Sequence, residues 1–331
     1  MIDNDTIEFG SYPQSEVTDE TLIDKLNEKA GTKPTAANSQ KWTSYKYYIS
    51  GNNDTDFMWY IDVEEGGEKY RGVYFTSYRP CLVTEPSTTE KSQQDNNKYD
   101  ITTVYWFEYE PISWTVLEKS YGEALILCDM IIDSQEYYIA NSGTRTIDGN
   151  TVYPNNYAYS TIRKWLNETF YNTAFNKLQK QIILTTTVDN SESSTGYSAN
   201  PNACEDTQDK IFLLSYKDLL NSNYGFSSSY DTEDAARQKK TTDYAQAQGV
   251  IDNAGNGWWW LRSPYNSKTG NVRAIDDTGY VYGYHVYATD RGVVPALHIS
   301  LDGDLKAYTS YTEDGVQKIK FGSYQIGRAH V

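Results

Sequence analysis

The stretch that decides the fold is Trp258-Trp259-Trp260-Leu261-Arg262-Ser263-Pro264, read together with a later run, Gly292-Val293-Val294-Pro295-Ala296-Leu297. Aromatic and β-branched residues of this kind favour strands. Alternation along the first run requires Trp259, or both of its tryptophan neighbours, to point inward, so we expect core packing here rather than a carbohydrate platform. The two runs therefore predict two packed strands that bracket the segment between them.

The bracketed segment, 271–287, alternates small apolar residues with polar and aromatic ones, as half-buried strands do. Asp277-Thr278-Gly279 supplies a turn, which predicts a hairpin, and Gly283-Tyr284 shifts the alternation by one residue. The predicted inward residues are Val272, Ala274, Val281 and Val286, and the predicted outward residues are Asn271, Arg273, Tyr280, Tyr282, His285 and Tyr287. Tyrosines with adaptable hydrogen-bonding neighbours are typical of a binding face; a hairpin that only covers its own core is the alternative.

Composition indicates one large domain with an aromatic core. The chain has 331 residues, of which 38% are hydrophobic and 15% aromatic, and 31 are tyrosines. A single mixed domain of this size is common. The core must rest on Tyr and Trp more than on Leu and Val, a profile that suits strands and surface platforms.

The charge of the chain narrows the class of partner. The formal net charge is −16 and the isoelectric point is about 4.6, which disfavours nucleic acids and anionic membranes because neither offers counter-charge. No apolar run reaches the roughly 18 residues of a membrane span, and the first residues lack the basic and apolar regions of a signal peptide. We expect no nucleic-acid partner and no membrane insertion.

Cysteine usage indicates neither a disulfide framework nor a zinc site. Cys81, Cys128 and Cys204 are odd in number and far apart, with no Cys-x-x-Cys pair. The simpler interpretation is that the three cysteines are small buried hydrophobic residues. The alternative is that two of them form a disulfide and the third is a free thiol. No acidic spacing matches an EF-hand loop. No metal or cofactor is predicted, although the aspartate content leaves calcium binding open.

The two ends of the chain share a motif. Residues 7–14, Ile-Glu-Phe-Gly-Ser-Tyr-Pro-Gln, recur as Ile-Lys-Phe-Gly-Ser-Tyr-Gln at 319–325, as expected for tandem copies of one large domain. Residues 326–331 resemble the translation of a sequencing adapter. We therefore expect 304–325 to be a linker and the start of a truncated second repeat, 326–331 to be an artefact, and the chain to be a fragment of a longer protein.

The remaining segments predict a mixed α+β domain. Residues 7–12 read as a strand with a bulge at Gly10, Thr18-Asp19 caps a helix that runs to Lys29, and aromatic runs within 42–78 predict a β-meander. Further predicted elements are strands at 104–107, 112–117, 124–128 and 211–214, a loop at 84–98 and a turn at Asp148-Gly149. Helices are predicted from Ser160, at 178–184, after the capping box Ser215-Tyr216-Lys217-Asp218 and at 234–249. The helix from Ser160 has one apolar stripe, formed by Ile162, Trp165, Leu166, Phe170 and Ala174, that we expect to face the core. The predicted domain is 1–303, with an inserted β-rich segment at about 40–100.

Several motifs together resemble a bacterial domain family of unknown function found mostly in gut Firmicutes. They are 7–14 (IEFGSYPQ), 111–117 (PISWTVL), 162–167 (IRKWLN), 209–215 (DKIFLLS), 259–264 (WWLRSP) and 292–297 (GVVPAL). Their order and spacing make the resemblance specific over about 5–301. One departure is Val294, where the family usually carries Arg before the proline, so a buried contact of that arginine would be missing.

The resemblance implies a C-type-lectin-like fold. That fold is shared by formylglycine-generating enzymes and by the receptors that diversity-generating retroelements mutate, and in those receptors the residues between the two bracketing strands form the ligand face. The copper site of the enzymes needs a late cysteine pair, but no cysteine follows Cys204. The related iron enzymes need a histidine cluster, and only His285 and His298 remain outside the adapter-like end. No zincin, nucleophile-elbow or P-loop motif is present.

These observations predict a non-enzymatic ligand-binding module of a larger secreted or surface-exposed bacterial protein, with a protein or a glycan as ligand. The predicted contact residues are Tyr265, Asn266, Asn271, Arg273, Asp276, Tyr280, Tyr282, Tyr284, His285 and Tyr287. We expect Arg262 to pair with an internal carboxylate. Two alternatives stay open: a structural spacer repeat without a specific ligand, and an enzyme with an unfamiliar site, which predicts a deep pocket with convergent titratable groups.

Overall fold

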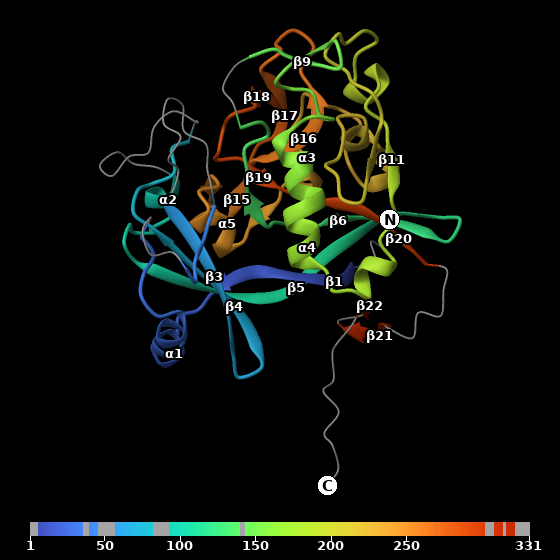
Figure 1. The fold of residues 1–331 in the computed structure, drawn as a ribbon. Helices are drawn as coiled ribbons and strands as arrows, with labels where there is room; N and C mark the ends of the chain where they lie inside the picture. The colour runs from blue at the N-terminus through green and yellow to red at the C-terminus, as the bar shows by residue number, and fades with distance from the viewer. Residues whose placement is uncertain are drawn as a thin grey trace.

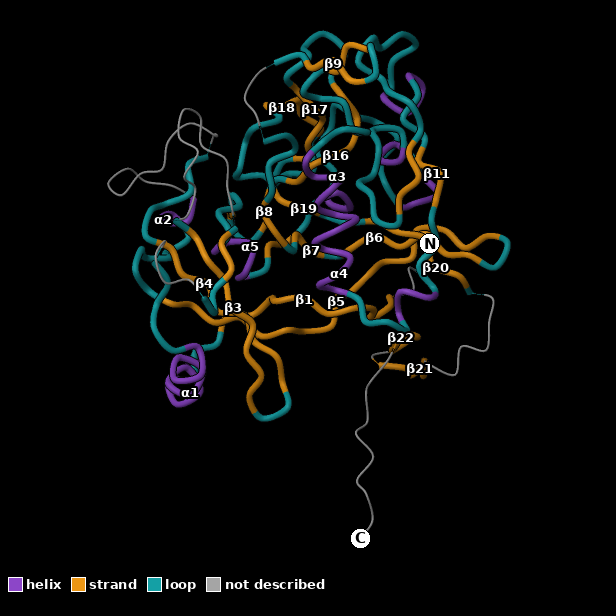
Figure 2. Tube along the Cα trace, viewed as in Figure 1, coloured by secondary structure: helices purple, strands orange, loops and turns teal. Residues whose placement is uncertain are grey.

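The fold is known from a computed structural model, and it is of the α+β class (Figure 1). The structure describes residues 6–35, 40–45, 57–81, 93–139 and 143–301, together with the backbone of 308–313 and 316–321. Figure 2 shows that strands and loops dominate and that helices are few. Most strand pairs are antiparallel, as expected for aromatic, alternating segments.

A nine-stranded sheet forms the base of the domain. Its strands are β1 Thr6–Glu16, β2 Thr43–Ser44, β3 Met58–Glu65, β4 Glu68–Phe75, β5 Val104–Ser120, β6 Glu123–Cys128, β20 Ala296–Ser300, β21 Tyr308–Glu313 and β22 Val316–Phe321. The long strand β5 pairs with β4 and β1 and, further along, with β6. The β-rich segment expected as an insertion thus supplies β2–β4, which continue this sheet.

The second sheet is five-stranded and contains the tryptophan motif of residues 258–264. Its order is β18 (Val281–His285), β17 (Asn271–Ile275), β16 (Trp259–Pro264), β19 (Gly292–Val293) and β8 (Asp133–Ser134). Trp259 and Trp260 are both fully buried, and their indole N–H groups donate to the backbone carbonyls of Arg237 and Gln135. The predicted bracketing strands and the hairpin between them are confirmed.

The helical segment from Ser160 links the two sheets in space (Figure 1). It comprises α3 Thr161–Trp165, a π-helical turn Leu166–Phe170 and α4 Tyr171–Ala174, and the Ser160 hydroxyl accepts from the Arg163 amide as the N-cap. The buried stripe is formed by Ile162, Leu166, Phe170 and Ala174. The predicted helix and its inward face are confirmed, while Trp165 is half-buried and stacks on Phe170.

A second, smaller core lies under α1 (Glu20–Ala30). Asp19 caps this helix through the Thr21 and Leu22 amides, and Gly31 follows its last residue, as the sequence predicts. The helix packs on a cluster formed by Val17, Leu26, Ala30, Trp42, Trp59, Val63, Tyr70, Tyr74 and Trp106. Five of these nine buried side chains are tryptophans or tyrosines, so part of the aromatic content of the chain packs this core.

Two helices expected from the sequence are not formed as predicted. Segment 178–184 has only a 3-10 turn at Gln179–Gln181, and Leu178 is 68% exposed. Segment 234–249 is divided into a 3-10 turn Ala235–Arg237, strand β13 Lys240–Thr241 and the short helix α5 Asp243–Ala247. The fully buried Arg237 donates to the carbonyls of Leu219, Ser227 and Ser229, so tertiary hydrogen bonds override the local helical preference.

The remaining elements are short. They are α2 Gln93–Asn96, β7 Met130–Ile131, β9 Arg145–Ile147, β10 Asn150–Val152, β11 Thr186–Val188, β12 Thr207–Asp209, β14 Asp252–Asn253, β15 Asn256–Gly257, and 3-10 turns at Glu192–Thr195, Asp218–Leu220 and Ser222–Tyr224. The capping box is confirmed, because Ser215 and Asp218 exchange hydrogen bonds through their side chains and amides. The run 211–214 is buried but makes only an isolated bridge at Phe212, so the expected strand is not formed.

The repeated motif brings the two ends of the chain together. Strand β22 pairs in parallel with β1, and Ile319 lies opposite Ile7, its counterpart in the first copy of the motif. Residues 322–331, with the adapter-like segment, lie outside the described residues, as do 304–307 of the expected linker and 84–92 of the expected loop. The described end of that loop, 93–98, contains the short helix α2 instead of irregular chain alone. Among the described residues, no helix is long and apolar enough to cross a membrane.

Candidate functional site

The hairpin β17–β18 is built around one aspartate in its turn. The Asp276 carboxylate accepts hydrogen bonds from the Thr278 amide (2.9 Å), the Thr278 hydroxyl (2.7 Å) and the Tyr280 amide (2.9 Å). Gly279 has a φ of +83°, which L side chains rarely adopt. Asp276 is buried at 7% exposure, so this predicted contact residue fixes the turn instead of facing a ligand.

Six rings form a continuous line on and beside this hairpin, and we call them the aromatic row. The row is Tyr280, Tyr282, Trp258, Tyr284, His285 and Tyr287. The successive ring centroids are separated by 5.0, 5.4, 5.9, 5.7 and 5.2 Å in that order. These spacings are those of rings in direct contact. Tyr282 is 47% exposed and His285 is exposed, while the other rings are half-buried.

Buried charge supports the centre of the aromatic row. The Arg291 guanidinium carbon lies 3.8 Å from the Tyr284 ring centroid and 4.3 Å from that of Trp258. Arg291 is only 2% exposed and pairs with Asp290 at 2.8 Å. Burial raises the pKa of the Asp290 carboxyl, although the Arg291 charge acts in the opposite direction. A cation beneath ring faces holds them in place, since the ring quadrupole attracts it.

Hydrogen bonds orient Trp258 within the row. Its indole N–H donates to Asp277 Oδ1 at 2.9 Å, and the Asn253 side-chain amide donates to the other oxygen of the same carboxylate. Asp277 is half-buried and Asn253 is exposed, so these two polar side chains form the solvent-facing edge of the row beside Trp258. The row therefore combines fixed ring faces with a polar rim.

The strand register corrects the predicted faces of the hairpin. Tyr284 lies opposite Val272 and Tyr282 opposite Ala274, whereas Arg273 lies opposite Gly283. Opposed residues share a face, so the tyrosines cover the small apolar residues, and Arg273 is on the other side of the sheet. The prediction that Asn271 and Arg273 share the tyrosine face was wrong, because the turn 276–280 pairs Ile275 with Val281 and so fixes this register. The predicted shift of the alternation at Gly283-Tyr284 was also wrong, because the ladder continues through both residues to His285 without a bulge.

The opposite face of the hairpin is buried and structural. Arg273 is 8% exposed and lies 4.6 Å from the Tyr265 ring, 4.9 Å from the Tyr216 ring and 5.3 Å from the Tyr197 ring. Asn271 is also 8% exposed. Polar groups on other segments hold the backbone here, since the Asn155 side chain donates to the Asn271 carbonyl at 3.0 Å.

Tyr265 lies on that second face too, and Asn266 follows it in the loop between β16 and β17. Tyr265 packs on Gly283, where an added Cβ would lie 2.5 Å from its ring. The Asn202 side chain donates to the backbone carbonyls of Tyr265 (2.7 Å) and Asn266 (3.2 Å). The structure therefore brings five of the predicted contact residues into the aromatic row, namely Tyr280, Tyr282, Tyr284, His285 and Tyr287. His285 lies opposite Asn271 and so leaves the strand on the other face, and its ring meets that of Tyr284 at the end of β18. The other predicted residues lie in the turn, on the opposite face or, for Asn266, in the loop between β16 and β17.

Sequence reasoning missed three residues of the site: Trp258, Asp277 and Arg291. Trp258 was assigned to the scaffold with its two neighbours, yet its two-residue spacing from Trp260 places it on the face that carries Tyr282. That spacing was the available signal. Asp277 was read only as a turn residue, and no sequence pattern pointed to Arg291.

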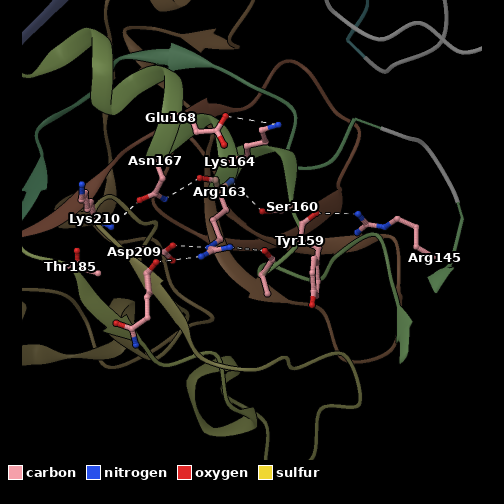
Figure 3. A pocket seen from close by; sticks show the side chains of 12 residues that line it. Arg145, Tyr159, Ser160, Arg163, Lys164, Asn167, Glu168, Thr185, Asp209 and Lys210 are labelled. Carbon is pink, nitrogen blue, oxygen red and sulfur yellow. Dashed lines mark hydrogen bonds and ion pairs between the residues drawn. The ribbon is translucent and has the colours of Figure 1, made fainter. Parts of the chain in front are cut away.

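Two other hollows of the surface carry charged side chains. Figure 3 shows the first, of about 560 Å³, where Arg163 pairs with Asp209 at 2.7 Å and Lys164 lies 3.9 Å from Glu168. Arg163 and Lys164 are thus partnered by carboxylates, whereas Arg145 donates to the Tyr159 carbonyl and Lys210 to the Tyr171 hydroxyl. The second, of about 740 Å³, includes Arg262, which pairs with Asp218 at 2.9 Å. The expectation that Arg262 pairs with an internal carboxylate is confirmed.

The cysteines and acidic residues form no site of their own. Cys81, Cys128 and Cys204 are free thiols, so the alternative with one disulfide does not hold. Burial raises the pKa of Cys128 to about 12 and that of Cys204 to about 11. Within the described part of the chain, no group of three or more His, Cys, Asp or Glu side chains is placed to hold a metal ion.

Comparison with known proteins gives one finding. A family model described as a domain of unknown function, DUF6273, matches residues 121–301. This span contains β16–β20 and every residue of the aromatic row. The comparisons gave no match to a curated protein and none to a solved structure.

Proposed function

The chain belongs to the DUF6273 family of domains of unknown function, and from this premise we propose that it is a non-catalytic recognition module whose contact face is the aromatic row. The proposal places the fold in the C-type-lectin-like group. The order of a tryptophan strand, a hairpin and a final strand along β16, β17, β18 and β20 supports this placement. The family resemblance of the sequence motifs supports a bacterial origin.

The observation that carries the proposal is the contiguity of the six rings. Singly exposed aromatic residues are normal on protein surfaces, but a connected line of them is typical of an interaction site. The contact of Trp258 and Tyr284 with Arg291 and the hydrogen bond from Trp258 to Asp277 hold the central rings before any ligand arrives. A preordered face loses little side-chain entropy on binding, which favours affinity.

The shape and charge of the row favour an extended ligand, either a protein surface or a glycan. The row is a line of ring faces with Asp277 and Asn253 at its edge. Ring faces attract aliphatic C–H groups and partly desolvated cations, whereas the net charge of −16 repels polyanions. We place the module in a larger secreted or surface-exposed protein, where such ligands are met.

The experiment is a screen followed by substitution. The intact chain is applied to a glycan array and to immobilised cell-surface proteins, and each hit is retested with the variant Tyr280→Ala/Tyr282→Ala/Tyr284→Ala. Loss of binding at unchanged fold supports the proposal. Binding by the triple variant at the wild-type level would exclude the row as the contact face.

A structural spacer is the second candidate, and one observation favours it. The second copy of the Ile-x-Phe-Gly-Ser-Tyr motif starts on β22, beside β1, so a following domain would begin next to the first strand of this one. Neighbouring repeats in the complete gene discriminate the two functions. A spacer varies over its whole surface, whereas a receptor varies mainly in the aromatic row.

A further inference from the structure

We propose a second binding site, independent of the aromatic row, in which the cavity between β1, β4, α5 and the helical segment 161–174 holds one neutral, sugar-sized polyol. The cavity measures about 190 Å³. Its walls are formed by Tyr12, Ser44, Tyr45, Tyr60, Arg71, Asp133, Gln135, Trp165, Thr169, Thr173 and Tyr244. At roughly 30 Å³ for each liquid water, this is the space of about six waters, which one pyranose ring with its hydroxyls would replace.

Asp133 supplies a buried acceptor without a counter-ion. It is 1% exposed, and its carboxylate accepts from the Tyr12 hydroxyl (2.7 Å), the Ser134 amide (2.7 Å) and the Gln135 side chain (3.0 Å). No Lys or Arg of the described residues forms an ion pair with it. A carboxylate has about four lone-pair positions, so Asp133 can accept one more hydrogen bond. Burial raises its pKa, because the charged carboxylate is poorly solvated there.

Arg71 supplies a buried cation that lines the cavity and whose bidentate contact is already taken by Asp62. Its Nε and one terminal nitrogen donate to the two oxygens of Asp62 at 2.8 and 3.0 Å. Its guanidinium carbon lies 4.3 Å from the Tyr60 ring centroid and 5.9 Å from that of Tyr244. Although burial acts to raise the pKa of Asp62, Arg71 and Lys69 lower it, so the pair stays ionised.

These two charges select a neutral ligand. A cationic ligand would meet the Arg71 guanidinium, and an anionic one would meet the Asp133 carboxylate. Asp62 already occupies the planar fork of Arg71, which removes the bidentate contact that a carboxylate or phosphate would need. A polyol avoids both conflicts, because each hydroxyl can donate as well as accept.

The other walls match the two faces of a sugar ring. The hydroxyls of Tyr45 and Tyr244 lie 2.8 Å apart, and Arg71 donates weakly to Tyr244 at 3.4 Å, so this wall is polar. Trp165, Thr169 and Thr173 are spaced four residues apart and form one stripe of the helical segment along the cavity. The Trp165 ring can stack on the C–H groups of a sugar ring, and the small threonines leave space beside it.

The test is calorimetric titration of the intact chain with glucose, galactose, mannose and N-acetylglucosamine. At least one of them is expected to bind saturably, and Asp133→Asn is expected to weaken that binding at least tenfold by replacing the acceptor. Thr173→Trp is expected to abolish sugar binding, because the larger side chain fills the cavity. Thr173 is half-buried on the helix, so we expect this variant to keep its fold. Asn172→Trp, at the exposed neighbouring position, is the matched control and should bind as the wild type does.

Several outcomes would overturn the site. They are the absence of binding by all four sugars, wild-type affinity in Asp133→Asn or Thr173→Trp, and tighter binding of glucosamine or glucuronic acid than of glucose. Tyr282→Ala separates this proposal from the proposed function. It removes a ring of the aromatic row and should leave the affinity for the sugar unchanged.

Discussion

The Tyr282 ring lies 5.4 Å from the Trp258 ring, centroid to centroid. Tyr282 is in β18 and Trp258 immediately precedes β16, and strand β17 runs between these two strands. Contact across an intervening strand requires a small residue on it. Ala274 meets this requirement, because it lies opposite both Trp260 and Tyr282. Through this contact, a tryptophan of the scaffold motif becomes part of the recognition face.

Replacing Trp258 should therefore lower stability as well as binding. Trp258→Ala removes the ring contacts to Tyr282 and Tyr284 and uncovers Arg291, so we expect a loss of about 2 kcal/mol in the free energy of unfolding, less than for a fully buried tryptophan. Urea unfolding measures this. Tyr282→Ala, at the 47% exposed position, should cost less than about 1 kcal/mol. Equal losses for the two variants would contradict the supporting role of Trp258.

The hairpin turn should be intolerant of a side chain at one glycine. At Gly279 the φ is +83° and an added Cβ would lie 2.0 Å from the Asp234 carbonyl oxygen, so Gly279→Ala should cost about 2–4 kcal/mol. Gly66→Ala is the control, since Gly66 has a φ of +63° with no atom within 4 Å of the added Cβ. It should cost only about 1 kcal/mol. A cost for Gly279→Ala no larger than this control would show that the close approach to Asp234 does not constrain the turn.

The sequence predicted those helices and strands that local patterns determine. It did not predict the elements that depend on tertiary contacts. The helix capped by Asp19, the buried stripe of the helical segment from Ser160 and the bracketing strands followed from periodicity and capping alone. The expected helix at 234–249 did not, because the buried Arg237 side chain donates to the carbonyls of Leu219, Ser227 and Ser229 in the preceding segment, which the local pattern of 234–249 does not contain. A similar limit applied to the site. The tyrosines were identified, but their face depended on a register that only the turn fixes.

The buried Asp133 should make a specific contribution to the pH dependence of stability. Burial raises its pKa in the folded state above the unfolded value of about 3.9. At a pH between the unfolded and the folded pKa of Asp133, the folded state binds more protons than the unfolded state. The free energy of unfolding therefore falls as pH rises through this range, and the full destabilisation by Asp133 is reached above its folded pKa. Asp133→Asn removes that cost.

Urea unfolding at several pH values tests this contribution. The stability of Asp133→Asn relative to the wild type should increase as pH rises from 4 to 7. Comparison with the wild type at each pH cancels the effects of other buried carboxylates, such as Asp290, whose pKa burial also raises. A pH-independent difference would mean that the pKa of Asp133 is the same in both states.

The three thiols should be unreactive in the folded protein. Burial raises the pKa of Cys128 to about 12 and that of Cys204 to about 11, and it also raises the pKa of the Cys81 thiol. Because the thiolate is the nucleophile, an aromatic disulfide reagent at pH 8 should react slowly with the native chain and rapidly with all three cysteines after unfolding. A thiol that reacts as fast in the native state as in denaturant would contradict the free, shielded arrangement.

The most direct test of the recognition face is the dissociation constant of the ligand found on the glycan or cell-surface array. It is measured for the wild type, for Tyr282→Ala and for Tyr121→Ala, where Tyr121 is a fully exposed tyrosine in the turn between β5 and β6. We expect Tyr282→Ala to weaken binding at least tenfold, a loss of about 1.4 kcal/mol, and Tyr121→Ala to bind as the wild type does. Unchanged affinity in Tyr280→Ala/Tyr282→Ala/Tyr284→Ala, or the absence of any ligand on either array, would contradict the account.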